Sequence, residues 1–294
     1  MAVTEDSHTG DSNHEAISFG EIVFDCFEGA FHLGGAPLNF AYYLRQFGVS
    51  VALVSAVGRD DFGEKALRLL TAADVDTTWV QSRPEPTGTV DVRLVNGAPE
   101  FIAVDGCAWE RIGPAGGFDG VRPALLYFGT VAQKTATNRT TFDALYATES
   151  PHTFLDINLR PRQYSPELVV DTLNKATILK MNENEWQMVR KITSQDTLAG
   201  LQESFDLEMI AITWGSRGAQ LQVAGERYVE EGLTVKVVDP IGSGDAFSAA
   251  LAAGVIRSAD PGYTLRVACD AGAATVQRRG ALVGLPNRLR KAFS

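Results

Sequence analysis

The stretch Val237–Phe247, which reads VVDPIGSGDAF, joins an apolar run to a turn with two glycines and the start of an alanine-rich segment. We expect a strand over residues 235–238 and a helix over residues 245–257. Glycines let the backbone turn tightly and aim several N–H groups at one point, where the helix dipole adds positive potential. The stretch therefore predicts an anion site. Asp245 beside it is either a proton acceptor or an ordinary residue of a helix start.

Alternating strand and helix patterns extend outward from this stretch along the chain. Apolar runs predict strands at 17–24, 51–57, 125–128, 153–158, 177–181 and 209–213. Helical patterns run from Pro37 to Phe47, from Phe62 to Ala73 and over residues 262–279. This order predicts an α/β protein with a mostly parallel sheet covered on both faces.

Residues 87–104 change the pattern from helical to alternating. Val90, Val92 and Leu94 alternate with polar residues, and Asn96-Gly97 is typical of a hairpin turn. The segment interrupts the strand–helix order. We therefore expect a small antiparallel flap inserted in the main domain, with one exposed face.

Composition excludes several classes of protein. The 294 residues include 26 Lys plus Arg and 36 Asp plus Glu, a formal net charge of −10, which argues against a general nucleic-acid binder. Residues 1–16 are acidic and lack Lys and Arg, so we expect a flexible tail and no signal peptide. The longest apolar stretch, 246–256, is about half of what a membrane-spanning helix needs, so we expect no membrane partner.

The three cysteines are scattered and show no zinc or redox spacing, which favours a cytoplasmic location; they are Cys26, Cys107 and Cys269.

Common nucleotide-binding motifs are missing from the sequence. The chain has no P-loop sequence, and Gly242-x-Gly244 lacks the third glycine of a dinucleotide fingerprint.

Four further polar segments follow predicted strands or open predicted helices. Asp156, Asn158 and Arg160 are alternate residues at the end of a predicted strand. Alternate residues of a strand share a face, so we expect these three side chains on one side. Such polar groups need partners, which a polyhydroxy ligand could supply. The other segments could equally be turns or caps: Gly34–Asn39, Asn182–Glu185 and Thr213–Gly218.

Taken together, these segments resemble the PfkB, or ribokinase-like, family of carbohydrate kinases, particularly its fructokinase-like members. The resemblance covers the chain from Ile17 to Pro286. It is carried by Gly20-Glu21 and Asp25, Gly34–Ala41, Val57–Asp60, Asp156–Arg160, Asn182–Glu185, Thr213–Gly218 and Asp239–Phe247. It implies a three-layer α/β/α domain over residues 17–294, whose β lid comes mainly from 87–104 and often mediates dimerisation.

The resemblance also implies ATP-dependent phosphorylation of a sugar hydroxyl, with ATP and Mg²⁺ as cofactors. Asp245 matches the catalytic base, and the backbone of Gly242, Ser243 and Gly244 matches the anion hole. Positions that match contacts to the sugar or the transferred phosphate are Asp25, Gly34, Gly35, Asn39, Asn158 and Arg160. Asn182 and Glu185 match the pair that organises magnesium and phosphate, Glu185 acting through water. Nucleotide-site positions are Thr213, Gly215 and Gly218, and Asp239 is a candidate near a monovalent cation such as K⁺.

Substrate identity is less sharply encoded than reaction type. Pro240 stands where many family members have Thr, and Ser243 where many have Ala. Fructose is the expected acceptor. Ribose, a nucleoside or a keto-acid sugar stays open because the anion hole and base do not encode the acceptor, and a catalytically silent sugar-binding or nucleotide-binding relative is the alternative from another class.

Overall fold

A computed structural model of the protein describes residues 14–27, 29–95, 98–114, 117–161 and 163–294. Nine strands of this part of the chain form one sheet, which is parallel except at the edge formed by the last two strands. In spatial order the strands are β13 (Glu226–Glu231), β12 (Gly218–Val223), β11 (Met209–Thr213), β10 (Ile178–Asn182), β9 (His152–Asp156), β8 (Leu125–Gly129), β1 (Ala16–Phe19), β4 (Val51–Gly58) and β5 (Val80–Arg83).

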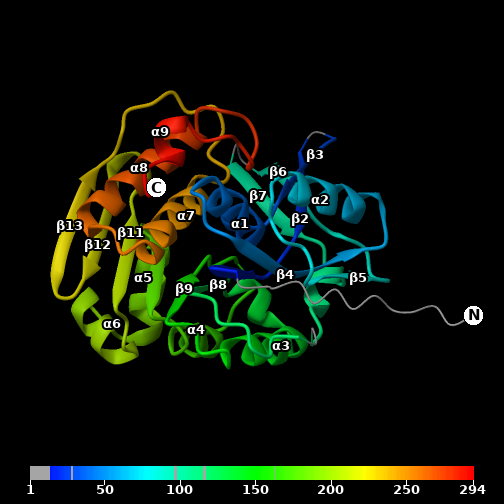
Figure 1. Ribbon diagram of the computed structural model, residues 1–294, viewed down its shortest axis with the longest axis horizontal. Helices are drawn as coiled ribbons and strands as arrows, with labels where there is room; N and C mark the ends of the chain where they lie inside the picture. The colour runs from blue at the N-terminus through cyan, green and yellow to red at the C-terminus, as the bar shows by residue number, and fades with distance from the viewer. Residues whose placement is uncertain (1–13, 28, 96–97, 115–116, 162) are drawn as a thin grey trace, which may run out of the picture.

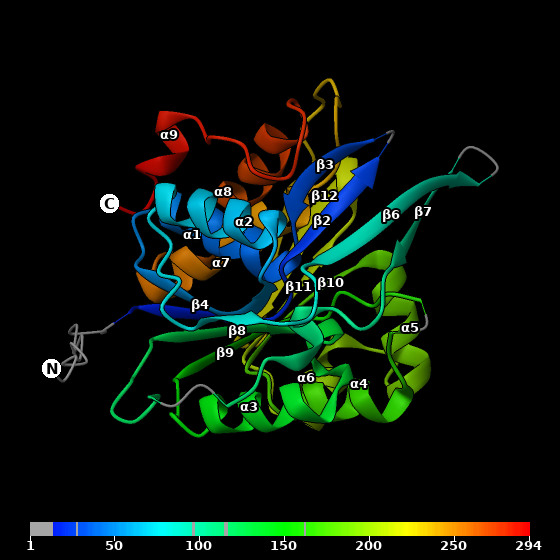
Figure 2. The same cartoon turned by 90° about the vertical axis from the view of Figure 1, so that its right-hand side faces the viewer.

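Helices cover both faces of this sheet, as Figure 2 shows. One layer contains α1 (Ala36–Gln46), α2 (Asp61–Ala72), α7 (Ser243–Ile256), α8 (Pro261–Thr275) and the short α9 (Asn287–Arg290). The opposite layer contains α3 (Ala136–Tyr146), α4 (Pro166–Leu173), α5 (Glu183–Thr193) and α6 (Leu198–Phe205). The predicted three-layer α/β/α arrangement with a mostly parallel sheet is confirmed.

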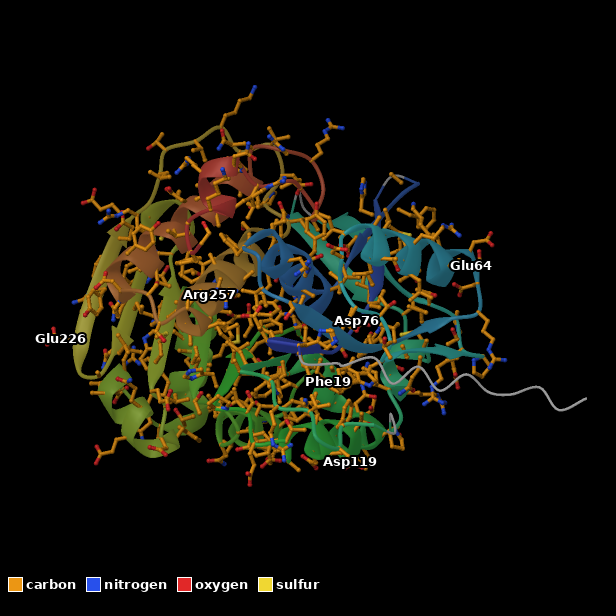
Figure 3. All side chains as sticks on the ribbon, viewed as in Figure 1. Phe19, Glu64, Asp76, Asp119, Glu226 and Arg257 are labelled. Atoms are coloured by element: carbon orange, nitrogen blue, oxygen red, sulfur yellow. The ribbon has the colours of Figure 1, made fainter. Side chains whose placement is uncertain are left out.

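The central strands are apolar on both faces because both faces are covered. Every residue of β1, β4 and β8 is buried. Two separate groups of buried side chains result, one beneath α1, α7 and α8 and one beneath α3 to α6. Figure 3 shows Phe19 of β1 in the interior, whereas Glu64 and Glu226 lie at the periphery.

Helix α7 occupies the middle of its layer, between α1 and α8 (Figure 1). Nine of its residues are buried, most of them alanines, and small residues allow close packing. A Cβ on Gly254 would lie 2.3 Å from Thr264 of α8. This close packing against α1 and α8 fixes α7 in its layer over the sheet.

A second, four-stranded sheet has the order β3 (Ala30–Gly34), β2 (Val23–Phe27), β6 (Gly88–Val95) and β7 (Ala98–Ala103). The expected hairpin is present as β6 and β7, and its predicted turn at 96–97 lies outside the described residues. The expectation of one strand over 17–24 was wrong, because the chain leaves the large sheet after Phe19 and β2 joins the small one.

Two other expectations also need correction. No strand forms over 235–238, where Val237 and Val238 are 59% and 47% exposed and the amides of Val238 and Asp239 donate to the Val276 carbonyl oxygen at the end of α8. The strands β12 and β13 occupy that edge of the sheet instead. The domain was expected to start at residue 17, but β1 starts at Ala16, and Glu15 accepts a hydrogen bond from the Ser50 amide and pairs with Arg257.

No helix in the described ranges has the length and apolar character needed to cross a lipid bilayer.

Candidate active site

The first turn of α7 is built around two glycines. Gly242, the residue before the helix, has φ 80°, and a Cβ there would lie 2.6 Å from the carbonyl oxygen of Ala281. No side chain caps this helix start. Because first-turn amides have no partner within their own helix, those of Gly244 and Asp245 are available to an anion. The Ser243 amide donates to the Pro240 carbonyl oxygen at 3.4 Å. A Cβ on Gly244 would lie 3.1 Å from Nζ of Lys180, so a lysine ammonium lies next to this turn.

Asp245 lies in the same turn and is held by a hydrogen bond from another helix. Nδ2 of Asn39, on α1, donates to Oδ2 of Asp245 at 2.7 Å. Burial raises the pKa of Asp245 to about 6, and the Asp156 carboxylate adds to the rise. The Asn39 amide, Lys180 and Arg160 act in the opposite direction. The carboxylate is therefore ionised at neutral pH yet close to taking up a proton, as a general base requires.

The start of α1 has the same construction. Gly35 precedes the helix with φ 112°, no side chain caps the helix, and a Cβ at Gly35 would lie 2.3 Å from the backbone oxygen of Glu21. A Cβ on Gly34 would lie 3.1 Å from Oδ2 of Asp25. Oδ1 of Asn39 is buried without a hydrogen-bond partner. Buried polar atoms are normally paired, so this oxygen suits a ligand that donates a hydroxyl proton.

Two carboxylates, Glu21 and Asp25, and the guanidinium of Arg160 lie near these two helix starts. Burial raises the pKa of Glu21 to about 7, and Asp245 adds to the rise while Arg160 opposes it. Burial also raises the pKa of Asp25, and Arg160 again opposes it. Arg160 is exposed. The structure thus brings Asp25, Asn39, Arg160 and Asp245 of the predicted site together.

The expectation that Asp156, Asn158 and Arg160 share one strand face was wrong. Strand β9 ends at Asp156, and Asn158 has φ 43°, a left-handed conformation that breaks the alternation. Asp156 is buried beneath α7, whereas Asn158 and Arg160 lie in the loop that follows.

Asn182 and Glu185 form the capping box of α5. The Asn182 side chain accepts from the Glu185 amide at 3.0 Å, and Glu185 accepts from the Asn182 amide at 2.8 Å. The other carboxylate oxygen of Glu185 accepts from the Leu159 amide at 3.0 Å. The pair therefore joins the loop after β9 to the start of α5.

The expected nucleotide-site positions lie at the ends of neighbouring strands. Thr213, at the end of β11, is in register with Asn182 at the end of β10. Gly215 follows with φ 61°, and Gly218 opens β12 with φ 99°. A Cβ on Gly218 would lie 2.0 Å from the Glu230 oxygen, so close strand pairing also accounts for that glycine.

Asp239 stabilises the loop before α7. Its Oδ1 accepts from the Ile241 amide at 3.1 Å and its Oδ2 from the Gly280 amide at 2.9 Å. Nowhere in the described ranges do three His, Cys, Asp or Glu side chains gather as a metal-binding group. The monovalent cation near Asp239 stays a prediction.

Sequence reasoning missed the polar side chains beneath the start of α7. Lys180 and Ser248 contact Asp156, and both are buried. The available signal was a lysine within the apolar strand Ile178–Asn182, where a charge needs a partner.

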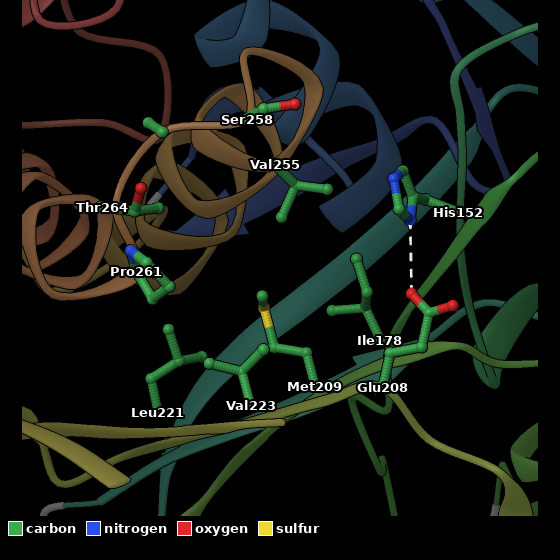
Figure 4. A pocket seen from close by; sticks show the side chains of 11 residues that line it. His152, Ile178, Glu208, Met209, Leu221, Val223, Val255, Ser258, Pro261 and Thr264 are labelled. Atoms are coloured by element: carbon green, nitrogen blue, oxygen red, sulfur yellow. Dashed lines mark ion pairs between the residues drawn. The ribbon is translucent and has the colours of Figure 1, made fainter. Parts of the chain in front are cut away.

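A cavity of about 260 Å³ lies at the other end of the strands, where β9, β10 and β11 begin (Figure 4). It is lined by the first residues of β10 and β11, Ile178 and Met209, and by His152, whose Nδ1 is 3.5 Å from Glu208. None of the predicted site residues lines it.

A family model for pfkB family carbohydrate kinases matches residues 9–288. The chain belongs to this family. This kinase is 27% identical to a fructokinase of Escherichia coli over 283 residues, which cover 87% of this chain and 89% of that protein. It is also 27% identical to a 2-dehydro-3-deoxygluconokinase of Thermoproteus tenax, over 87% of this chain and 83% of the relative. A fructokinase structure from Xylella fastidiosa with bound ATP superposes with a TM-score of 0.82 at 20% identity and covers 95% of the kinase and 97% of that chain.

Proposed function

We propose that this carbohydrate kinase transfers the γ-phosphate of ATP to a hydroxyl of a ketohexose, with fructose as the preferred acceptor and Asp245 as the general base. The observation that carries the proposal is the half-buried Asp245 carboxylate, which lies in the first turn of α7 and accepts a hydrogen bond from Asn39. The curated fructokinase relatives and the ATP-bound structural neighbour support the choice of acceptor and donor.

In this mechanism the sugar hydroxyl faces the Asp245 carboxylate, and the γ-phosphate lies at the backbone amides of the first turn of α7. The hydroxyl oxygen bonds to the γ-phosphorus of ATP, the bond from that phosphorus to the bridging oxygen of ADP breaks, and Asp245 takes up the hydroxyl proton. The amides of the Gly242–Gly244 turn stabilise the charge on the transferred group. Asn39 fixes the carboxylate so that its free oxygen can face the acceptor.

Magnesium, when bound with ATP, neutralises phosphate charge and orients the γ-phosphate. Glu185 fits a water-mediated role because each of its oxygens accepts one backbone hydrogen bond and each has a second lone pair. Asn182 is exposed at the same helix start and suits the phosphate side of this arrangement.

The small sheet is proposed to act as a lid over the site. Two copies of the chain are proposed to pair through this sheet as a dimer. Its strand β2 carries Asp25 and its strand β3 ends at Gly34, so the sheet is continuous with the sugar side of the site. Closure would exclude water, which could otherwise take the phosphoryl group. A monomer in light scattering at micromolar concentration would contradict the dimer and leave the kinase unaffected. A cytoplasmic location, favoured by the scattered cysteines, stays a prediction.

A second acceptor class is favoured by Arg160. Its exposed guanidinium lies near Asp25 and Asp245 and could pair with the carboxylate of a keto-acid sugar. The relative from Thermoproteus tenax carries that activity in its name.

The deciding experiment is ADP release from ATP with fructose, ribose, adenosine or 2-keto-3-deoxygluconate, and without acceptor as the control. Fructose should give the highest kcat/KM. Arg160→Ala should affect a keto acid more than fructose if the carboxylate pairs with this residue. Preference for adenosine or a keto acid would remove the fructose assignment. No acceptor-dependent ADP release would argue against the proposed reaction for all four acceptors.

A further inference from the structure

A buried ion pair lies directly beneath the start of α7. Asp156 and Lys180 are 2% and 7% exposed, and Nζ of Lys180 is 3.1 and 3.0 Å from the two oxygens of Asp156. Removing two charges from water costs free energy that their attraction does not always repay. A pair at this place therefore calls for a role beyond holding the sheet together.

The pair contacts α7 at two positions that share one helix face. Ser248 donates to Oδ2 of Asp156 at 2.9 Å. Lys180 lies against Gly244, where an added Cβ would be 3.1 Å from Nζ. Residues four apart lie one above the other on a helix. These contacts lie on either side of Asp245 in the sequence and connect the first two turns of α7 to the end of β9 and the middle of β10.

We propose that Asp156 and Lys180 are positioning residues, which hold the first two turns of α7 on the sheet and set the proton affinity of Asp245 through their opposite charges. This inference rests on the proposed function, in which Asp245 is the base. Neither side chain needs to touch the substrate for this role.

The charges around Asp245 support the proposal. After burial itself, the Asp156 carboxylate is the strongest influence raising the pKa of Asp245, while Lys180 lowers it. Burial alone would lower the pKa of Lys180, but the carboxylates of Asp156, Glu185 and Asp245 raise it, so the ammonium stays charged. The other titratable or charged groups that interact with Asp245 are Arg160, Glu21, Tyr43 and Tyr127.

The two partners should therefore change Asp245 in opposite directions. Asp156→Asn removes a negative charge and leaves the ammonium, so the pKa of Asp245 should fall. Lys180→Met removes the positive charge and leaves the carboxylate, so it should rise. A pair with a structural role alone would lower stability in both variants and leave the Asp245 titration unchanged.

The test is the titration of the Asp245 side-chain carboxyl by ¹³C NMR in the full chain. The midpoint should move by at least about half a pH unit, downward in Asp156→Asn and upward in Lys180→Met. Lys175→Met is the matched control, because Lys175 pairs with Asp143 in a more exposed position, and it should leave the midpoint in place. A midpoint that stays within about 0.2 unit in both test variants, or moves in the same direction in both, overturns the proposal.

The double variant keeps the test decisive if Lys180→Met fails to fold. In Asp156→Asn/Lys180→Met the lysine charge, which lowers the pKa of Asp245, is removed as well. The midpoint should therefore lie above that of Asp156→Asn alone. A midpoint equal to or below that of Asp156→Asn contradicts the proposal.

The same variants separate this inference from the proposed function, because the NMR titration needs no turnover. The acidic limb of the kcat profile should move with the midpoint. If the midpoint moves while that limb stays in place, Asp245 is not the base, although it is coupled to the ion pair. If no acceptor is phosphorylated, the proposed function is wrong and the titration still decides whether the pair sets the proton affinity of Asp245.

Discussion

Helices α7 and α6 begin in opposite ways. Thr197 caps α6 by accepting from the Gly200 amide at 3.0 Å, whereas α7 begins after Gly242 without a side-chain cap. Among the helices of the described residues, α2, α3, α4, α5 and α8 also have side-chain caps, and α1, α7 and the four-residue α9 do not. Of these last three, α1 and α7 supply Asn39 and Asp245. The capped helices satisfy a first-turn amide with their own N-cap side chain, whereas α7 does not, and we propose that α7 leaves its amides to a ligand. At α1 the Glu21 carboxylate accepts from the Ala36 amide.

The largest expected effect is on turnover at the open helix start. Asp245→Asn keeps the size of the side chain but removes the carboxylate that accepts the proton. We expect kcat to fall by at least about 10²-fold, with thermal stability and ATP affinity little changed. Steady-state kinetics, a melting curve and calorimetric ATP binding check this. Turnover near the wild-type rate would show that Asp245 is only a helix-start residue.

A smaller loss is expected when the shape of the same turn is changed. Gly242→Ala places a Cβ 2.6 Å from the Ala281 oxygen at φ 80°, so the turn must shift and kcat should fall by about tenfold or more. Gly225→Ala is the matched control, because Gly225 has φ 81° with no atom within 4 Å of the added Cβ. It should cost about 1 kcal/mol of stability and leave kcat unchanged. Equal kcat values for the two variants would argue against the turn as the anion site.

The pH dependence should report the same carboxylate. Asp245 accepts a proton only when ionised, and its pKa is raised to about 6. Turnover at saturating substrate should therefore fall as the pH is lowered through about 6, approaching a tenfold loss per unit below it. A profile flat down to pH 4.5 would mean that no such base limits the reaction.

The smallest effect is expected at a capped helix start. Thr197→Ala removes the hydrogen bond to the Gly200 amide and should lower the free energy of unfolding by about 1 kcal/mol. Since α6 holds none of the proposed site residues, kcat should stay at the wild-type value. Denaturant unfolding measures the loss of stability, and the kinetic assay measures kcat. A changed kcat with unchanged stability would contradict the contrast between the two helix starts.

The elements that carry the site could be predicted because strong local signals mark them. Pro37 and the glycines before it mark the start of α1, and the glycine turn marks the start of α7. The edge strand β13 was missed because its sequence, ERYVEE, is mostly charged and its residues are exposed or half-buried. The apolar run 235–238 predicted a strand that does not form, since pairing depends on a neighbour that local sequence does not reveal.

Side-chain contacts across the fold were harder to predict than the elements. The hydrogen bond from Asn39 to Asp245 joins residues 206 positions apart, and the pairing of Lys180 with Asp156 depends on two strands lying side by side. Asn158 illustrates the same limit, because one left-handed residue moved it off the expected face. The family resemblance supplied roles for Asn39 and Asp245 but none for Lys180.

The most direct test of the contrast between open and capped helix starts is an amide NMR titration of the full chain with ATP and magnesium. The account predicts that the largest shifts fall on the amides of residues 242–245, while those of Leu198, Ala199 and Gly200 in the capped α6 stay in place. Shifts of equal size at both helix starts, or none at residues 242–245 under saturating ATP, would contradict it.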